Sequence, residues 1–233
     1  MGSKKTIDKL AKIFGDAAVE VLSNSSGADI YFAPTVQKVD LIYLKPDIGT
    51  FVQFRGDYSG LVIVNFTKEA AMEYYRMSML NMGFPAEELA IDHTADDVVD
   101  SIGESVNQLI GKARQMIQEE YGLSSYNNQP KAVCLMESIL LSINTMIHHK
   151  PSDCRRLSFR ISGRHTFHIE MFIEQTEFII LDPERLKAGQ QKSSNRDLDI
   201  DAMMDAEKAD KKEKETVAAT NNLDIEALLN ANR

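Results

Sequence analysis

The sequence predicts an α+β fold in which helices pack on a mostly antiparallel sheet. Strand-like segments come in two consecutive groups, one in each half of the chain, and helical segments precede and separate these groups. Consecutive strands favour antiparallel pairing, because parallel neighbours need a long crossover between them. In addition, 43% of the residues are apolar, which is enough for a sizeable core.

The first half is expected to begin with a helix. From Ile7 onward, apolar residues recur at spacings of three and four, and the segment 24–27 (NSSG) ends the pattern. The turn at residues 56–60 (GDYSG) is typical of a hairpin between the two strands that flank it. The strands of this half are expected at about residues 39–44, 50–54 and 60–66.

A second helix is expected at about residues 68–82, because Gly83 suits a C-terminal cap and Pro85 prevents continuation. A third and longer helix is expected at about residues 95–121. Thr94, with an Asp three residues later, has the spacing of a capping box at its start. The remaining strands are expected at about residues 139–148, 156–162 and 166–174.

The third helix carries the polar residues of most interest. At about 100° per residue, its apolar residues gather on one face, whereas Glu104 and Asn107 fall side by side on the opposite face. Asp100 and Gly111 share that outer face, and Gln108 lies at its edge. An interior Gly costs about 1 kcal/mol relative to Ala, and close approach of another backbone would explain Gly111. From spacing alone, the simpler interpretation is a solvated helix surface.

Composition changes sharply after the last apolar run, which ends just before Pro183. The following stretches are too polar to bury the apolar surface that would offset their chain entropy. We therefore expect a folded domain at residues 1–182 and a disordered tail at residues 183–233.

Several classes of protein are disfavoured. The chain has 35 acidic against 26 basic residues, a net charge of −9, which argues against a general nucleic-acid binder. No apolar run approaches the ~20 residues that span a bilayer, so membrane insertion is not expected. Cys134 and Cys154 make no disulfide framework. These features favour a cytoplasmic protein.

The histidines do not suggest a metal site. His165 and His168 have an odd spacing, so on one strand they point to opposite faces. The neighbouring pair His148 and His149 has no companion ligand motif. No metal site and no cofactor of the chain's own is expected.

The segment 100–111 (DSIGESVNQLIG) resembles the helix signature of the CheC/CheX-type chemotaxis phosphatases, which carry Glu-x-x-Asn on an exposed helix. The order of elements over about residues 6–175 is also similar to theirs. Because the chain has one such motif, it is most similar to the single-site CheX branch. Members of that branch tend to be dimers, so the resemblance implies a possible homodimer.

The resemblance implies a protein phosphatase that hydrolyses the aspartyl phosphate of a response-regulator receiver domain, in chemotaxis or related two-component signalling. Carried over by position, Asn107 would orient the attacking water and Glu104 would pair with a Lys of the receiver. The phosphorylated receiver would supply the phosphoryl group and its Mg²⁺. Asp100, Gln108 and Gly111 would belong to the surface that binds it.

The tail contains a repeat, since residues 198–206 (LDIDAMMDA) recur as residues 223–231 (LDIEALLNA) with five of nine positions identical. The motif resembles peptides at the N-termini of flagellar switch proteins of the FliM and FliY kind, and the tethering helix of the CheZ phosphatase, which bind a phosphorylated receiver. Alternatively, the two copies dock back on this domain or form only weak helices. The apolar residues expected to contact a partner are Leu198, Ile200, Met203, Met204, Leu223, Ile225, Leu228 and Leu229.

Two functions without catalysis remain open at this point. In one, the same fold binds a receiver through the tail motifs and has no useful turnover. In the other, the chain is an adaptor of the flagellar switch that uses the tail peptides on that assembly.

Overall fold

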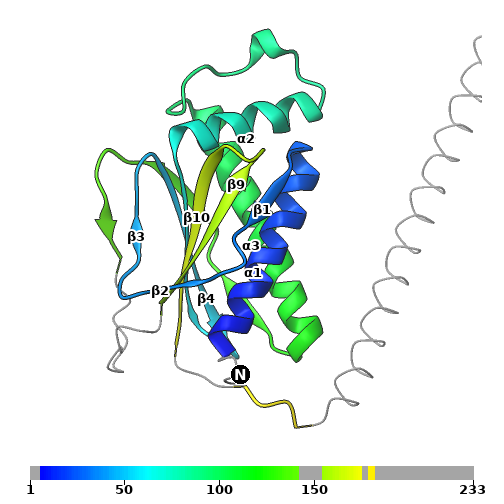
Figure 1. Ribbon diagram of the computed structural model, residues 1–233, viewed down its shortest axis with the longest axis vertical. Helices are drawn as coiled ribbons and strands as arrows, with labels where there is room; N and C mark the ends of the chain where they lie inside the picture. Colours follow the sequence, from blue (N-terminus) through cyan, green and yellow to red (C-terminus); the bar gives the residue numbers. More distant parts are fainter. Residues whose placement is uncertain (1–5, 142–153, 175–177, 182–233) are drawn as a thin grey trace, which may run out of the picture. The chain divides into compact units, whose positions relative to one another are not determined.

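The computed structural model describes residues 6–141, 154–174 and 178–181, drawn as coloured ribbons in Figure 1. The chain divides into two units, residues 1–180 and 181–233, and the described part of the second is Leu181 alone. Both copies of the tail repeat therefore lie outside the described residues. Within the described ranges, no helix combines the length and apolar character needed to cross a bilayer.

The described residues form helices and short to medium strands. The helices are α1 (Thr6–Ser26), α2 (Lys68–Asn81), the 3-10 turn η1 (Ala86–Glu88) and α3 (Asp96–Tyr121). The strands are β1 (Ile30–Phe32), β2 (Gln37–Val39), β3 (Tyr43–Leu44), β4 (Ile48–Gly56), β5 (Gly60–Phe66), β6 (Ser125–Asn127), β7 (Lys131–Cys134), β8 (Ile139–Leu140), β9 (Cys154–Ile161) and β10 (His165–Ile173).

The main sheet confirms the predicted α+β class, because every strand pair in the described ranges is antiparallel. Its order is β1-β9-β10-β5-β4-β6, with β2 also beside β9 and β7 also beside β4. The strands β3 and β8 form a separate small sheet. Helices α1 and α3 run along one face of the main sheet, and β3 lies on its other side (Figure 1).

Strand β5 lies at the centre and is buried along its whole length. Val62 and Val64 belong to the larger apolar cluster, which includes the helices. Leu61 and Ile63 belong to a smaller cluster with Leu44 of β3. Burial on both faces explains why this strand is a continuous apolar run rather than an alternating one. The predicted hairpin is confirmed, since Phe54 of β4 pairs with Gly60 of β5.

The predicted end of α2 is confirmed, whereas the predicted start of α3 needs correction. At the end of α2, Gly83 has a φ of +90°, and Phe84 N–H donates to Met79 O over 3.0 Å, as in a Schellman cap. The capping box expected at the start of α3 is wrong. Its N-cap is Ala95, which makes no side-chain cap bond. The hydroxyl of Thr94 instead donates to Asp92 Oδ1 over 2.6 Å, a local bond that competes with capping.

Two strand predictions also need correction. The segment 39–44 is interrupted, because β2 pairs with β9 whereas β3 crosses over to pair with β8. The strand expected at residues 139–148 is limited to Ile139–Leu140 in the described part, since residues 142–153 lie outside it. Three short strands, β1, β6 and β7, were not anticipated.

Candidate functional site

The outer face of α3 presents the predicted polar residues to solvent. Glu104 and Asn107 are both exposed, and so are Asp100, Gln108 and Gly111. The buried side of the helix is somewhat wider than the angular argument suggested. It comprises Val98, Ile102, Ser105, Val106, Leu109, Ile110, Ala113 and Ile117.

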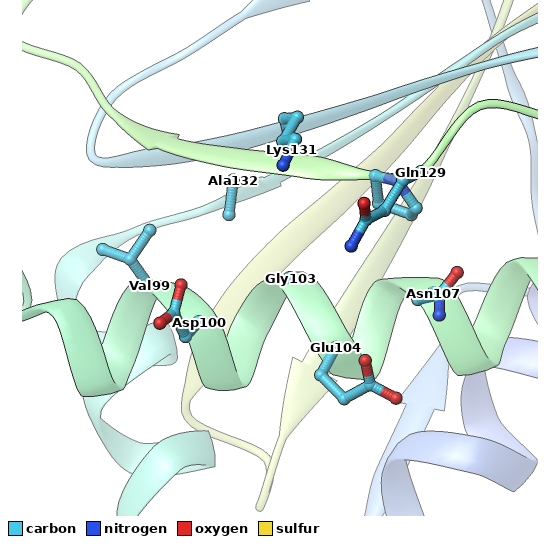
Figure 2. A pocket seen from close by; sticks show the side chains of 9 residues that line it. Val99, Asp100, Gly103, Glu104, Asn107, Gln129, Lys131 and Ala132 are labelled. Carbon is cyan, nitrogen blue, oxygen red and sulfur yellow. The ribbon is translucent and has the colours of Figure 1, made fainter.

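A groove of about 310 Å³ separates this part of α3 from the segment that enters β7. Figure 2 shows Glu104 and Asn107 on neighbouring turns of the helix, with the Gln129 amide on the strand side of them. The Glu104 carboxylate extends away from the strand, where an approaching molecule can reach it. The groove is lined by Val99, Asp100, Gly103, Glu104, Asn107, Gln129, Pro130, Lys131 and Ala132.

Small side chains set the distance between the helix and β7. A Cβ added at Gly103 would lie 3.6 Å from the Cβ of Ala132, which is ordinary van der Waals contact. Sequence reasoning missed Gly103, although a glycine inside a helix is a recognisable signal. It also missed Gln129 and Lys131, because β7 was not predicted.

Gly111 has a different environment from the one expected. A Cβ added at this position would meet nothing within 4 Å among the described residues. The described part of the chain therefore supplies no backbone that approaches Gly111. Close approach of another backbone to Gly111 stays a prediction.

The rotation of α3 is fixed by hydrogen bonds next to Glu104. The buried Ser105 accepts from the Tyr74 hydroxyl over 2.8 Å and donates to Ser101 O over 2.8 Å. The Tyr74 hydroxyl also lies 2.7 Å from Ser25 Oγ. This chain of contacts links α1, α2 and α3, so it holds the Glu104 and Asn107 face outward.

The C-terminal half of α3 is tied to its neighbours by two cations. Lys112 Nζ lies 2.6 Å from Glu20 Oε1 on α1. Arg114 Nη1 donates to Asn127 Oδ1 on β6 over 2.8 Å, and Nη2 donates to Ser125 O. Because β6 leads directly into the β7 segment, Arg114 also helps to place Gln129 beside the helix.

The charges of the site come from exposed side chains. Glu104 Oε1 accepts a hydrogen bond of 3.2 Å from Gln108 Nε2, one turn later on the same helix. Asp100 adds a second carboxylate, and Lys131 stands across the groove from both. Such a site can present a carboxamide, a carboxylate and an ammonium to a polar partner.

Cysteine is a poor candidate for chemistry in this region. Partial burial raises the pKa of the Cys134 thiol, and the carboxylates of Asp92, Asp47 and Asp96 act in the same direction. The thiolate, which is the nucleophilic form, is therefore disfavoured.

The described ranges contain no group of three side chains placed to ligate a metal. His165 Nε2 lies 3.3 Å from Glu73 Oε2, whereas His168 Nδ1 lies 3.1 Å from Ser158 Oγ. The two rings thus have separate partners, in keeping with their odd spacing. His148 and His149 lie outside the described residues.

The predicted contact residues of the tail cannot be placed beside this site. All eight fall in residues 182–233, outside the described part of the chain. They stay predictions from the sequence.

Comparison with solved structures shows what this architecture is similar to. A putative chemotaxis protein from Desulfovibrio vulgaris Hildenborough is 22% identical with a TM-score of 0.57, over 71% of this chain and 97% of that one. The chemotaxis protein CheX from Desulfovibrio desulfuricans is 22% identical with a TM-score of 0.55, over 71% and 99%. CheX from Vibrio vulnificus is 17% identical with a TM-score of 0.56, again over 71% and 99%.

These similarities establish the fold and confirm the structural part of the resemblance. No curated protein matches the sequence. A family described as "Protein of unknown function (DUF3334)" matches residues 4–231, a range that includes both copies of the tail repeat. The chain therefore belongs to the DUF3334 family, and its described domain has the CheX fold.

Proposed function

We propose that this protein is a phosphatase that hydrolyses the aspartyl phosphate of a response-regulator receiver domain. One observation carries the proposal: Glu104 and Asn107 are exposed one turn apart on α3, beside a groove, in a chain with the CheX fold. The sequence between residues 100 and 111 resembles the signature of the phosphatases with this fold.

The proposed chemistry needs little from the protein beyond positioning. The Asn107 carboxamide can accept a hydrogen bond from a water and donate one, so it can hold that water in line with phosphorus. The water oxygen bonds to phosphorus as the bond from phosphorus to the aspartyl oxygen breaks. Inorganic phosphate and the receiver's free carboxylate result, and the water proton leaves with phosphate or solvent. A 100-fold acceleration needs only about 2.7 kcal/mol.

Glu104 would orient the two proteins. Its carboxylate is a suitable partner for the Lys of the receiver, and the receiver would hold the Mg²⁺ that neutralises the phosphoryl charge. The hydrogen bond from Gln108 restricts the Glu104 side chain before docking. Because both groups are exposed, a receiver Lys can replace that bond without burying an unpaired charge.

The test is phosphate release from a panel of phosphorylated receiver domains, with wild type and Asn107→Ala side by side. We expect wild type to accelerate release from at least one receiver, and Asn107→Ala to lose about 100-fold of that acceleration. The matched control is Gln37→Ala, which removes an exposed carboxamide from β2 at the far edge of the sheet. Equal rates for wild type and Asn107→Ala would overturn the proposed role.

The duplicated tail motif favours a second candidate, a receiver-binding protein without turnover. Two docking peptides on one chain suit capture or sequestration as well as catalysis. Under this alternative, wild type binds a receiver but leaves its rate of phosphate release unchanged. The same panel therefore separates the two functions.

A further inference from the structure

The groove beside α3 has a cation that the phosphatase signature does not account for. Lys131 opens strand β7 and lines the groove together with Glu104 and Asn107. Figure 2 shows it on the strand that runs above the helix, across the groove from Asp100 and Glu104. The other charged residues that line the groove are carboxylates, so Lys131 supplies its positive charge.

Lys131, like Lys38 and some other basic residues of the described domain, makes no ion pair with a described residue. Lys45, by contrast, lies 2.7 Å from Glu170 Oε1, and Lys112 lies 2.6 Å from Glu20 Oε1. The Lys131 side chain is exposed. A ligand can therefore engage its ammonium group without breaking an internal salt bridge.

The backbone that carries this ammonium group is held in place. Lys131 pairs with Phe51 of β4, and Ala132 pairs with Thr50 in the same antiparallel ladder. Ala132 also lies beside the helix, since a Cβ added at Gly103 would come within 3.6 Å of the Ala132 Cβ. The position of the strand relative to Asn107 is thus fixed, and the flexible stem of Lys131 lets its charge adapt to a partner.

A phosphorylated receiver would meet an unfavourable field here without this cation. Asp100 and Glu104 are both exposed on the docking face, and the whole chain has a net charge of −9. At physiological salt, exposed charges act over roughly 8 Å, so charges within the groove dominate what a phosphoryl group experiences. An ammonium is a good partner for phosphoryl oxygens.

We propose that Lys131 is a specificity-determining residue, whose ammonium group contacts the phosphoryl oxygens of the receiver and makes binding depend on phosphorylation. This inference rests on the proposed function. Because phosphoryl transfer spreads a nearly constant charge over those oxygens, the contact would serve the bound state and the transition state alike. Lys131 therefore acts on KM, whereas Asn107 acts on kcat.

Binding measurements in the Asn107→Ala background test this directly, because that variant should bind without turning over its partner. We expect Lys131→Met in this background to raise the Kd for the phosphorylated receiver about tenfold and to leave the Kd for the unphosphorylated receiver unchanged. Lys131→Arg should retain most of the affinity, since it keeps the charge. The matched control is Lys38→Met, which removes an exposed lysine on β2 at the opposite edge of the sheet.

Kinetics with an intact Asn107 provide a second measurement. Lys131→Met should raise KM about tenfold with kcat nearly unchanged, and added salt should reduce the difference from wild type. Equal loss of affinity for both states of the receiver, or no loss, would overturn the role of Lys131. If Lys131 has no such role but wild type still accelerates phosphate release from a receiver, the phosphatase proposal survives. If no phosphorylated receiver binds or is hydrolysed, both proposals fail together.

Discussion

His168 is a titratable residue that the candidate site does not use. It lies on β10, where Nδ1 is 3.1 Å from Ser158 Oγ. Burial lowers the pKa of this imidazole below its ordinary 6.5, and the cations Arg156 and Lys45 lower it further, whereas Glu170 opposes the shift. The folded protein therefore disfavours the protonated ring.

The sign of the resulting pH dependence follows from linkage. Above pH 6.5 the ring is neutral in both the folded and unfolded chain, so its contribution to stability is fully retained. As the pH falls from 6.5 toward the lower folded pKa, the unfolded chain takes up the proton more readily, and stability is lost. We expect the free energy of unfolding to fall less between about pH 7.5 and about pH 5.5 in His168→Gln than in wild type. Urea unfolding at the two pH values measures this difference, and an equal fall in both proteins would contradict the argument.

Residue-scale contacts of this kind could not be predicted from the sequence. The buried Glu170 carboxylate accepts from Lys45 Nζ over 2.7 Å and from Arg156 Nε over 2.8 Å. Lys45 is 125 positions away along the chain. Composition gives no indication of such pairing, because it depends on β10 and the β3 region meeting on one side of the sheet.

Among the elements, α3 allows the clearest test of the docking surface. Substitutions at Gly111 are expected to change the stability of the domain and the docking of the receiver in different directions. A side chain at this position enters open space. Gly111→Ala should therefore raise the free energy of unfolding by about 1 kcal/mol, the difference in helix propensity. Gly111→Leu should also fold, but its bulk would stand on the surface where we propose that the receiver docks. We expect it to lower kcat/KM for phosphate release while urea unfolding shows no loss of stability.

If Gly111→Leu releases phosphate as fast as wild type, this turn of α3 does not contact the receiver. That result would leave Glu104 and Asn107 untouched as candidates, because both lie nearer the groove. Gly111→Ala supplies the matched control, since it makes the same backbone change with little added bulk.

Long elements could be predicted from the sequence more reliably than short ones. The 26 residues of α3 form about seven turns, which is enough for a clear apolar periodicity. That periodicity predicted the outer face that carries Glu104 and Asn107. The four residues of β7 give too little alternation to recognise a strand. Because β7 forms the second wall of the groove, Gln129 and Lys131 were hidden with it, and half of the site was missed.

For the whole molecule, the order of strands determines which parts of the chain depend on one another. The late strands β9 and β10 lie between β1 and β5, both from the first half of the chain. The buried Arg155 of β9 donates to Asp8 Oδ1 of α1 over 2.6 Å, across 147 positions. The antiparallel character of this sheet was predictable from consecutive strands, but its interleaved order was not, because that order comes from tertiary packing.

The tail motifs lead to the last prediction, which concerns how the folded domain finds its partner. The composition of the tail predicts a flexible linker, and about 38 such residues span roughly 35 Å. A receiver held by either motif would therefore face α3 at a local concentration of order millimolar. Ile200→Ser combined with Ile225→Ser removes a central apolar residue from each copy. We expect KM for phosphate release to rise about tenfold with kcat unchanged, since tethering supplies encounters rather than chemistry.

Each single variant provides the internal control, because the remaining copy can still tether the receiver. The effect of Ile200→Ser or Ile225→Ser alone should be much smaller than that of the pair, as expected for two redundant sites. This pattern differs from that of Lys131→Met, which should act on the phosphorylated state alone and respond to salt. An unchanged KM in the double variant would mean that the domain captures its receiver through the α3 face without the tail motifs. In that case, the repeat would serve a different contact, such as the switch adaptor function left open by the sequence.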